Sequence, residues 1–171
     1  MNSPVPAEGV FSVLTRRPSM ADGLDLVLAL VAFGVAANVL GRDLLAFDLI
    51  PLATFLPMAV LALLTPAVAE EVVFRGLLIR NGSISSASLT LAASTALFVV
   101  WHVVESLTFL PGARLLFLRG DFLVLAAVLG LLCGLLRLRS GGLWTAIALH
   151  WLVVVIWKAM LGGPTLTNLV G

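Results

Sequence analysis

The sequence predicts an all-α protein: a polytopic bundle of about five to six transmembrane helices with a polar centre inside the membrane. The chain is 61% hydrophobic and only 11% charged, whereas a soluble domain carries about 25% charged residues. Its mean hydropathy is +1.15, and its apolar runs approach the roughly 20 residues that cross a bilayer. A net charge of +1 without a basic patch predicts no nucleic-acid partner.

We expect residues 1–22 to form an N-terminal surface tail and residues 23–171 a single transmembrane domain. The first apolar run, 24–40, is interpreted as a span. Within it, Val35-Ala36-Ala37 loosely resembles a signal-peptide cleavage site. The long leading region and the membranous segments that follow favour the span.

The second span, residues 49–68, holds three prolines. Proline kinks a transmembrane helix, which is tolerated where neighbours satisfy the freed carbonyls. Pro66 precedes Glu70 by four residues, so we expect a bend there. The helix is predicted to continue to Arg80 and to stop at Asn81-Gly82, a good C-terminal signal.

Three further spans are expected, at residues 85–104, 122–138 and 143–161, with the longest loop at 105–121. Gly130 and Gly134 match a small-residue pattern that suits either a dimer or contact within the bundle, so the oligomeric state stays open. Basic residues favour a cytoplasmic N-terminus. Arg42, Arg114 and Arg119 would lie outside, and the inside set would be Arg16, Arg17, Arg75, Arg80, Arg137 and Arg139.

Charged residues interrupt the apolar sequence at Glu70, Glu71 and Arg75. Ionisable groups at such a place mark a functional site by default. Glu71 and Arg75 are four residues apart and can pair on one helix face, whereas Glu70 has no local cation.

The two histidines of the chain, His102 and His150, each lie inside a separate hydrophobic segment. Together with the glutamates they predict a shared polar centre. Lys158 is a further polar candidate near the end of the last span. Cys133, the single cysteine, lies among small apolar residues and is expected to pack.

Such a centre contains the parts for hydrolysing an amide bond without a covalent intermediate. A buried carboxylate can act as a general base toward water, and histidines can orient the water, stabilise an oxyanion or protonate a leaving amine. The same residues could hold zinc across helices, could serve a proton-coupled transporter, or could form a structural ion-pair bundle.

The order of the motifs resembles that of the CAAX protease and bacteriocin-processing (Abi) family. Glu70-Glu71-x-x-x-Arg75 is followed by Phe98-x-x-x-His102 and then by His150, and the match covers about residues 59–155. The resemblance implies an intramembrane endopeptidase. Its catalytic residues would be Glu70, His102 and His150, with Glu71, Arg75 and Phe98 in support.

By this resemblance, Glu70 activates water, His102 positions it, and His150 stabilises the oxyanion. No cofactor is expected, with zinc bound by Glu70, His102 and His150 as the alternative. The family usually has Asn or Asp four residues after the last histidine, where this chain has Val154. Trp151 is a speculative replacement donor, and Asn168 lies too far along the chain. A non-catalytic immunity or assembly protein of the same fold therefore stays an alternative.

The resemblance also implies a location and a substrate. The short chain suits a small bacterial member, similar to the myxosortases, in the bacterial inner membrane with its N-terminus in the cytoplasm. The expected partners are the lipid bilayer and a substrate protein or peptide with a membrane-inserted or lipidated C-terminal tail.

Overall fold

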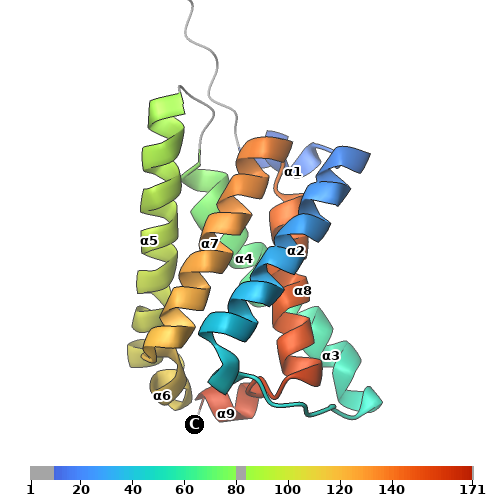
Figure 1. The fold of residues 1–171 in the computed structure, drawn as a ribbon, viewed down its shortest axis with the longest axis vertical. Helices are drawn as coiled ribbons and strands as arrows, with labels where there is room; N and C mark the ends of the chain where they lie inside the picture. The colour runs from blue at the N-terminus through green and yellow to red at the C-terminus, as the bar shows by residue number, and fades with distance from the viewer. Residues whose placement is uncertain (1–9, 80–83, 171) are drawn as a thin grey trace, which may run out of the picture.

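The computed structural model describes residues 10–79 and 84–170, and these residues form an all-α bundle (Figure 1). The fold class predicted from the sequence is confirmed. Its elements, in chain order, are α1 Val10–Thr15, α2 Met20–Leu40, η1 Arg42–Leu44, α3 Leu52–Ala62, η2 Leu63–Val68, α4 Ala69–Glu71, η3 Val72–Leu77, α5 Ile84–Thr108, η4 Pro111–Ala113, α6 Arg114–Phe117, α7 Gly120–Ser140, α8 Trp144–Met160 and α9 Leu166–Val170.

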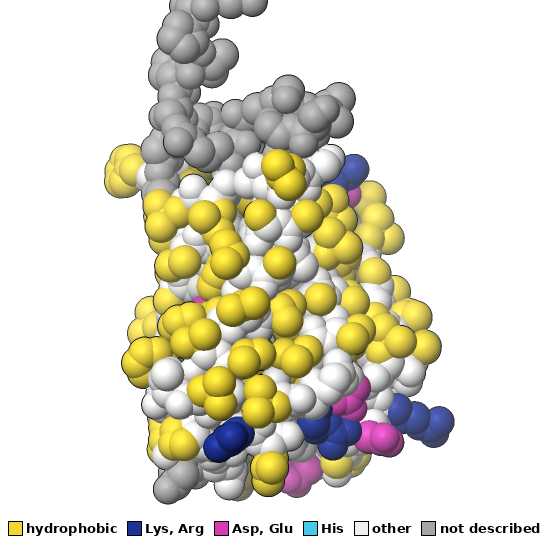
Figure 2. All heavy atoms as spheres, turned by 90° about the vertical axis from the view of Figure 1, so that its left-hand side faces the viewer, with side chains coloured by type: hydrophobic (Ala, Val, Ile, Leu, Met, Phe, Trp, Pro, Cys, Tyr) yellow, Lys and Arg dark blue, Asp and Glu magenta, His cyan; other side chains and the backbone are white. Residues whose placement is uncertain are grey.

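Four helical segments are long and apolar enough to cross a membrane: Met20–Leu40, Leu52–Leu77, Ala87–Thr108 and Gly120–Ser140. Helix α8 is apolar and 17 residues long, which is at the lower limit for a span. Figure 2 shows hydrophobic side chains covering the α5 side of the bundle, with most charged side chains gathered at the end where α6 and α9 lie. The chain is an integral membrane protein with multiple spans.

The first span starts four residues earlier than the predicted Leu24, because a capping box starts α2 at Met20. The Asp22 carboxylate accepts a hydrogen bond from the backbone N–H of Ser19 at 2.7 Å, and the Ser19 hydroxyl accepts one from the backbone N–H of Asp22 at 3.2 Å. This reciprocal pair satisfies backbone donors that the start of a helix leaves free.

The second span is broken just before the glutamates, as the proline pattern predicts. Thr65 has extended backbone angles, φ −143° and ψ 116°, and π-helical turns lie on both sides of α4. Such turns occur often at functional sites. The carbonyl of Phe74 in η3 accepts a hydrogen bond from the Ser94 hydroxyl of α5 at 2.7 Å. The helix ends at Leu77, earlier than predicted, and the predicted end, Arg80 to Gly82, lies outside the described residues.

Helix α5 is longer than predicted and ends at Thr108. The expected loop at 105–121 is therefore shorter and contains η4 and α6. Glu105 belongs to the last turns of α5, a placement that matters for the site.

Helices α5 and α7 approach closely at the two glycines of the small-residue pattern. A Cβ atom on Gly130 would lie 3.1 Å from the Phe98 ring, and one on Gly134 would lie 2.2 Å from Leu91 Cδ1. These glycines therefore serve contact within the bundle.

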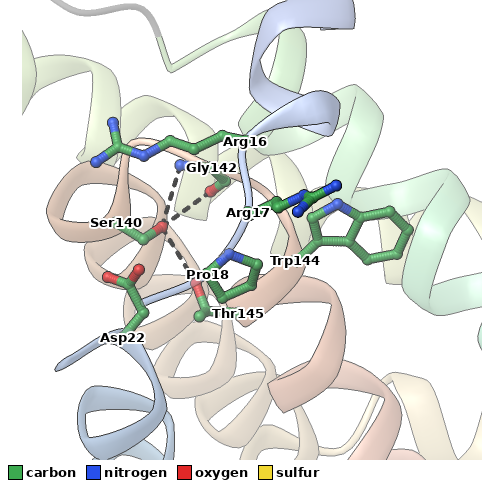
Figure 3. A pocket seen from close by; sticks show the side chains of 8 residues that line it. All are labelled: Arg16, Arg17, Pro18, Asp22, Ser140, Gly142, Trp144 and Thr145. Carbon is green, nitrogen blue, oxygen red and sulfur yellow. Dashed lines mark hydrogen bonds between the residues drawn. The ribbon is translucent and has the colours of Figure 1, made fainter. Parts of the chain in front are cut away.

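The segment before α2 packs on the turn between α7 and α8. The carbonyls of Val13 and Leu14 accept hydrogen bonds from the Leu143 N–H at 3.2 Å and the Trp144 indole at 2.7 Å. Figure 3 shows the residues that line a small pocket at this junction, where the Ser140 hydroxyl bonds to Gly142 and Thr145.

Candidate active site

Glu71 and Arg75 form a fully buried ion pair within the broken second span. Arg75 Nη1 lies 3.1 Å from Glu71 Oε1, and both side chains are 0% exposed. This is the pairing that the four-residue spacing predicts.

The Glu71 carboxylate also holds His150 of α8. His150 Nδ1 lies 2.9 Å from Glu71 Oε1. Because an ionised carboxylate can only accept, Nδ1 carries the proton and donates it. The other ring nitrogen, Nε2, is thereby directed to Glu70, whose Oε2 lies 4.0 Å away.

Glu70 is the freer of the two carboxylates, as predicted. It is 8% exposed whereas Glu71 is 0% exposed, and its buried Oε2, like that of Glu71, has no hydrogen-bond partner among the described residues. A buried oxygen of this kind costs free energy, which is expected where a group must stay available for chemistry.

Arg75 connects the site to α5 and α7. Its Nη2 donates to the Gly130 carbonyl at 2.9 Å, and its guanidinium carbon lies 4.3 Å from the centre of the Phe98 ring. Phe98 is fully buried. Arg75 can make both contacts because α5 and α7 approach closely at Gly130.

Phe98 also contacts both histidines. Its ring centre lies 4.8 Å from that of His102 and 5.6 Å from that of His150. His102 Nδ1 lies 2.9 Å from the Phe98 carbonyl, to which it can only donate, so Nε2 is the acceptor nitrogen of the neutral ring. Phe98 thus packs against both histidines.

One large cavity joins these groups. It has a volume of about 1320 Å³ and is lined by Glu70, His102 and His150 together with mostly apolar side chains from α2, α3, α5, α7 and α8. Glu71 and Arg75 are absent from the lining and lie behind the other groups. The structure therefore brings together all six residues singled out in the sequence, with the three expected catalytic ones facing the cavity.

Two residues of this site, Trp101 and Glu105 of α5, are not among those that the sequence predicts. Both line the cavity, and the Trp101 indole lies beside the carboxylates of Glu70 and Glu105. The available signal is the spacing of Glu105, three residues after His102 and thus on the same helix face. This spacing is not recognised when the predicted third span ends at residue 104.

Val154 occupies the position where the family usually has Asn or Asp. Val154 lines the cavity and offers no hydrogen bond. The proposed replacement by Trp151 is wrong, because its indole N–H donates to the Ala59 carbonyl at 2.8 Å. Asn168 bonds within the α9 segment, where its Oδ1 accepts from the Thr165 N–H at 3.0 Å.

Other polar candidates have structural surroundings. Cys133 is fully buried, and its thiol contacts the Ala146 carbonyl at 3.6 Å. Lys158 is half-buried at the cavity and donates to the Pro164 carbonyl.

The alternative zinc ligands are Glu70, His102 and His150. Within residues 10–79 and 84–170, no three His, Cys, Asp or Glu side chains converge as metal ligands would. Glu70, His102 and His150 line the same cavity but do not form such a group.

Comparison with known families gives an independent finding. Residues 52–156, more than half of the chain, match the family model described as type II CAAX prenyl endopeptidase Rce1-like. The chain belongs to this family. No curated protein and no solved structure matched. The matched range contains Glu70, His102 and His150, so the family of membrane endopeptidases supports protease activity for this chain.

Proposed function

We propose that the chain is a glutamate-type intramembrane endopeptidase in which Glu70 activates the water that cleaves the substrate. One observation carries this proposal: the buried, unpartnered Oε2 of Glu70 faces His150 Nε2 across 4.0 Å. Such a separation is too long for a direct hydrogen bond but suits two groups that act on one water molecule.

The reaction begins with proton transfer from water to the Glu70 carboxylate. The water oxygen forms a bond to the scissile carbonyl carbon, and the carbonyl π electrons move to its oxygen. His102 Nε2 faces the same cavity as an acceptor and orients the water. When the C–N bond breaks, Glu70 returns its proton to the leaving amine.

His150 stabilises the oxyanion in its protonated form. Nε2–H then donates into the cavity beside Glu70, while the Glu71 carboxylate at Nδ1 stabilises the positive ring. Val154 supplies no second donor. Because one oxyanion donor is worth about 10²–10³ in rate, we expect slower turnover than with an amide at this position.

The substrate is proposed to be a membrane-inserted or lipidated C-terminal tail. The cavity of about 1320 Å³ exceeds the roughly 300–1,000 Å³ typical of small-ligand pockets, and its apolar lining suits a lipid-soluble segment. We propose a bacterial inner-membrane location with the N-terminus in the cytoplasm, on the basis of the arginine distribution.

The competing function is a non-catalytic immunity or assembly protein of the same fold, and Val154 is the observation that favours it. The deciding experiment is cleavage of a library of C-terminal tails by purified protein, compared with Glu70→Gln, His150→Ala and the exposed control Asp43→Asn. Cleavage by the wild type and the control, lost in the other two, supports the protease. A Glu70→Gln variant that cleaves normally refutes the role of Glu70.

A further inference from the structure

Glu105 is a carboxylate that the proposed hydrolysis does not use. It is half-buried in the last turns of α5 and lines the same cavity as Glu70. The Trp101 indole lies beside both the Glu105 and the Glu70 carboxylates. Glu105 is therefore a neighbour of the catalytic groups, on the His102 face of α5.

No described side chain neutralises this charge. The ion pairs formed by residues 10–79 and 84–170 do not include Glu105. Lys158 lines the cavity too, but it donates to the Pro164 carbonyl and does not reach Glu105. The buried Nε1 of Trp101, beside Glu105, also lacks a regular hydrogen bond. A half-buried carboxylate without a paired cation is costly, which points to a cation supplied from outside the chain.

Trp101 lies beside Glu105, Phe109 follows it by one helical turn, and Phe117 and Phe122 pack on the neighbouring His102. The Trp101 and Phe109 ring centres are 6.1 Å apart, and the Phe117 and Phe122 rings stack at 4.6 Å. All four side chains line the cavity. Aromatic faces attract cations, and desolvation strengthens this attraction.

We propose that Glu105 and these four aromatic side chains bind a lysine or arginine side chain of the substrate, close to the bond that is cleaved. This rests on the proposed function and assigns Glu105 as a specificity-determining residue. The aliphatic stem of such a side chain suits the apolar wall, and its charged end suits the carboxylate.

The spacing along α5 gives the position of the cation in the substrate. Glu105 follows His102 by three residues, which is close to one helical turn or about 5 Å. An extended peptide advances about 3.3–3.6 Å per residue. Allowing for the length of the side chain, the basic residue lies within about three positions of the scissile bond.

Binding tests this site without requiring cleavage. The protein carries Glu70→Gln, and the probes are fluorescent peptides of leucine and alanine with one lysine, glutamine or glutamate at a scanned position. We expect the lysine peptide to bind at least about tenfold more tightly than the glutamine peptide. Adding Glu105→Gln should reduce this ratio below about twofold, and Glu105→Lys should make the glutamate peptide the preferred one.

Two variants act as controls. Asp43→Asn removes an exposed carboxylate in η1, next to the cavity-lining Leu44, and should keep the lysine preference. Glu105→Asp should keep it as well. A lysine preference that persists in Glu105→Gln overturns the proposal. So does loss of neutral-peptide binding in both Glu105→Gln and Glu105→Asp, because Glu105 would then be structural.

Cleavage of the same peptides by protein with Glu70 intact separates this inference from the proposed function. Preferred binding of lysine peptides without cleavage of any tail refutes the protease and leaves the cation site standing. Equal cleavage of lysine and glutamine peptides refutes the cation site and leaves the protease standing.

Discussion

The adjacent glutamates should respond in opposite ways to the same isosteric change. Glu71 Oε1 receives Arg75 at 3.1 Å and His150 at 2.9 Å, and only its Oε2 is without a hydrogen-bond partner in the described structure. Glu70 Oε2 also has no such partner, and neither Arg75 nor His150 donates to Glu70. Glu71→Gln therefore removes the counter-charge of a guanidinium that is 0% exposed. Glu70→Gln removes a charge that lies 4.0 Å from the His150 ring and accepts no hydrogen bond from it.

The contacts set the size of the two effects. Breaking one side of a buried ion pair costs about 3–5 kcal/mol. The glutamine oxygen can still accept one hydrogen bond, and the Gly130 carbonyl and Phe98 ring still hold Arg75, so we expect about 3 kcal/mol for Glu71→Gln. This corresponds to a drop of about 6–12 °C in thermal midpoint. For Glu70→Gln we expect a change below about 1 kcal/mol.

Thermal unfolding and tail cleavage of both variants, purified in the same detergent, provide the assay. Glu71→Gln should be destabilised and lose about 10²-fold or more in rate, because His150 loses its orienting partner. Glu70→Gln should unfold like the wild type and cleave nothing. If Glu70→Gln is destabilised as strongly as Glu71→Gln, the division between a structural and a chemical glutamate is wrong.

Three further outcomes follow from the contacts. Gly130→Ala should lower the free energy of unfolding by about 1–3 kcal/mol and reduce cleavage, because the new Cβ would lie 3.1 Å from both Arg75 Nη2 and the Phe98 ring. A variant with wild-type stability and activity would contradict this packing. Trp151→Phe should lower the free energy of unfolding by about 1 kcal/mol through loss of the hydrogen bond to Ala59, and the folded variant should retain cleavage. A stable variant that does not cleave would show that the indole takes part in the chemistry. Chelator treatment should leave cleavage unchanged, and inhibition that zinc reverses would replace water activation by Glu70 with metal ligation.

The sequence predicts the helices and the partners of the polar centre because both follow from simple rules. Apolar runs of about 20 residues define spans, and charges within them must find each other or serve a function. The Glu71–Arg75 pair follows from helical spacing alone. The break near Pro66 follows from the missing backbone N–H of proline.

The remaining features depend on tertiary contacts that no local pattern contains. Helix α5 continues to Thr108 and therefore contains Glu105. The sequence alone predicts a loop at Glu105, because a charged residue follows an apolar run there. Trp151 is a free donor by sequence, but α3 presents the Ala59 carbonyl to it. The π-helical turns around α4 likewise depend on partners such as Ser94, which satisfies a backbone carbonyl from a different helix.

The placement of Glu71 and Arg75 on one helix has a consequence for how the protein enters the membrane. Transmembrane segments insert before they assemble into a bundle, and an unpaired charge at the centre of a segment costs about 2.5–3.5 kcal/mol on insertion scales. Leu52–Leu77 contains both members of the pair, so they can neutralise each other before any other helix is present. Had the arginine been placed on α7 or α8, the segment would have to enter the lipid with both carboxylates unpaired. The four-residue spacing of Glu71 and Arg75, which orients the site, therefore also lowers the free-energy cost of inserting this helix into the membrane.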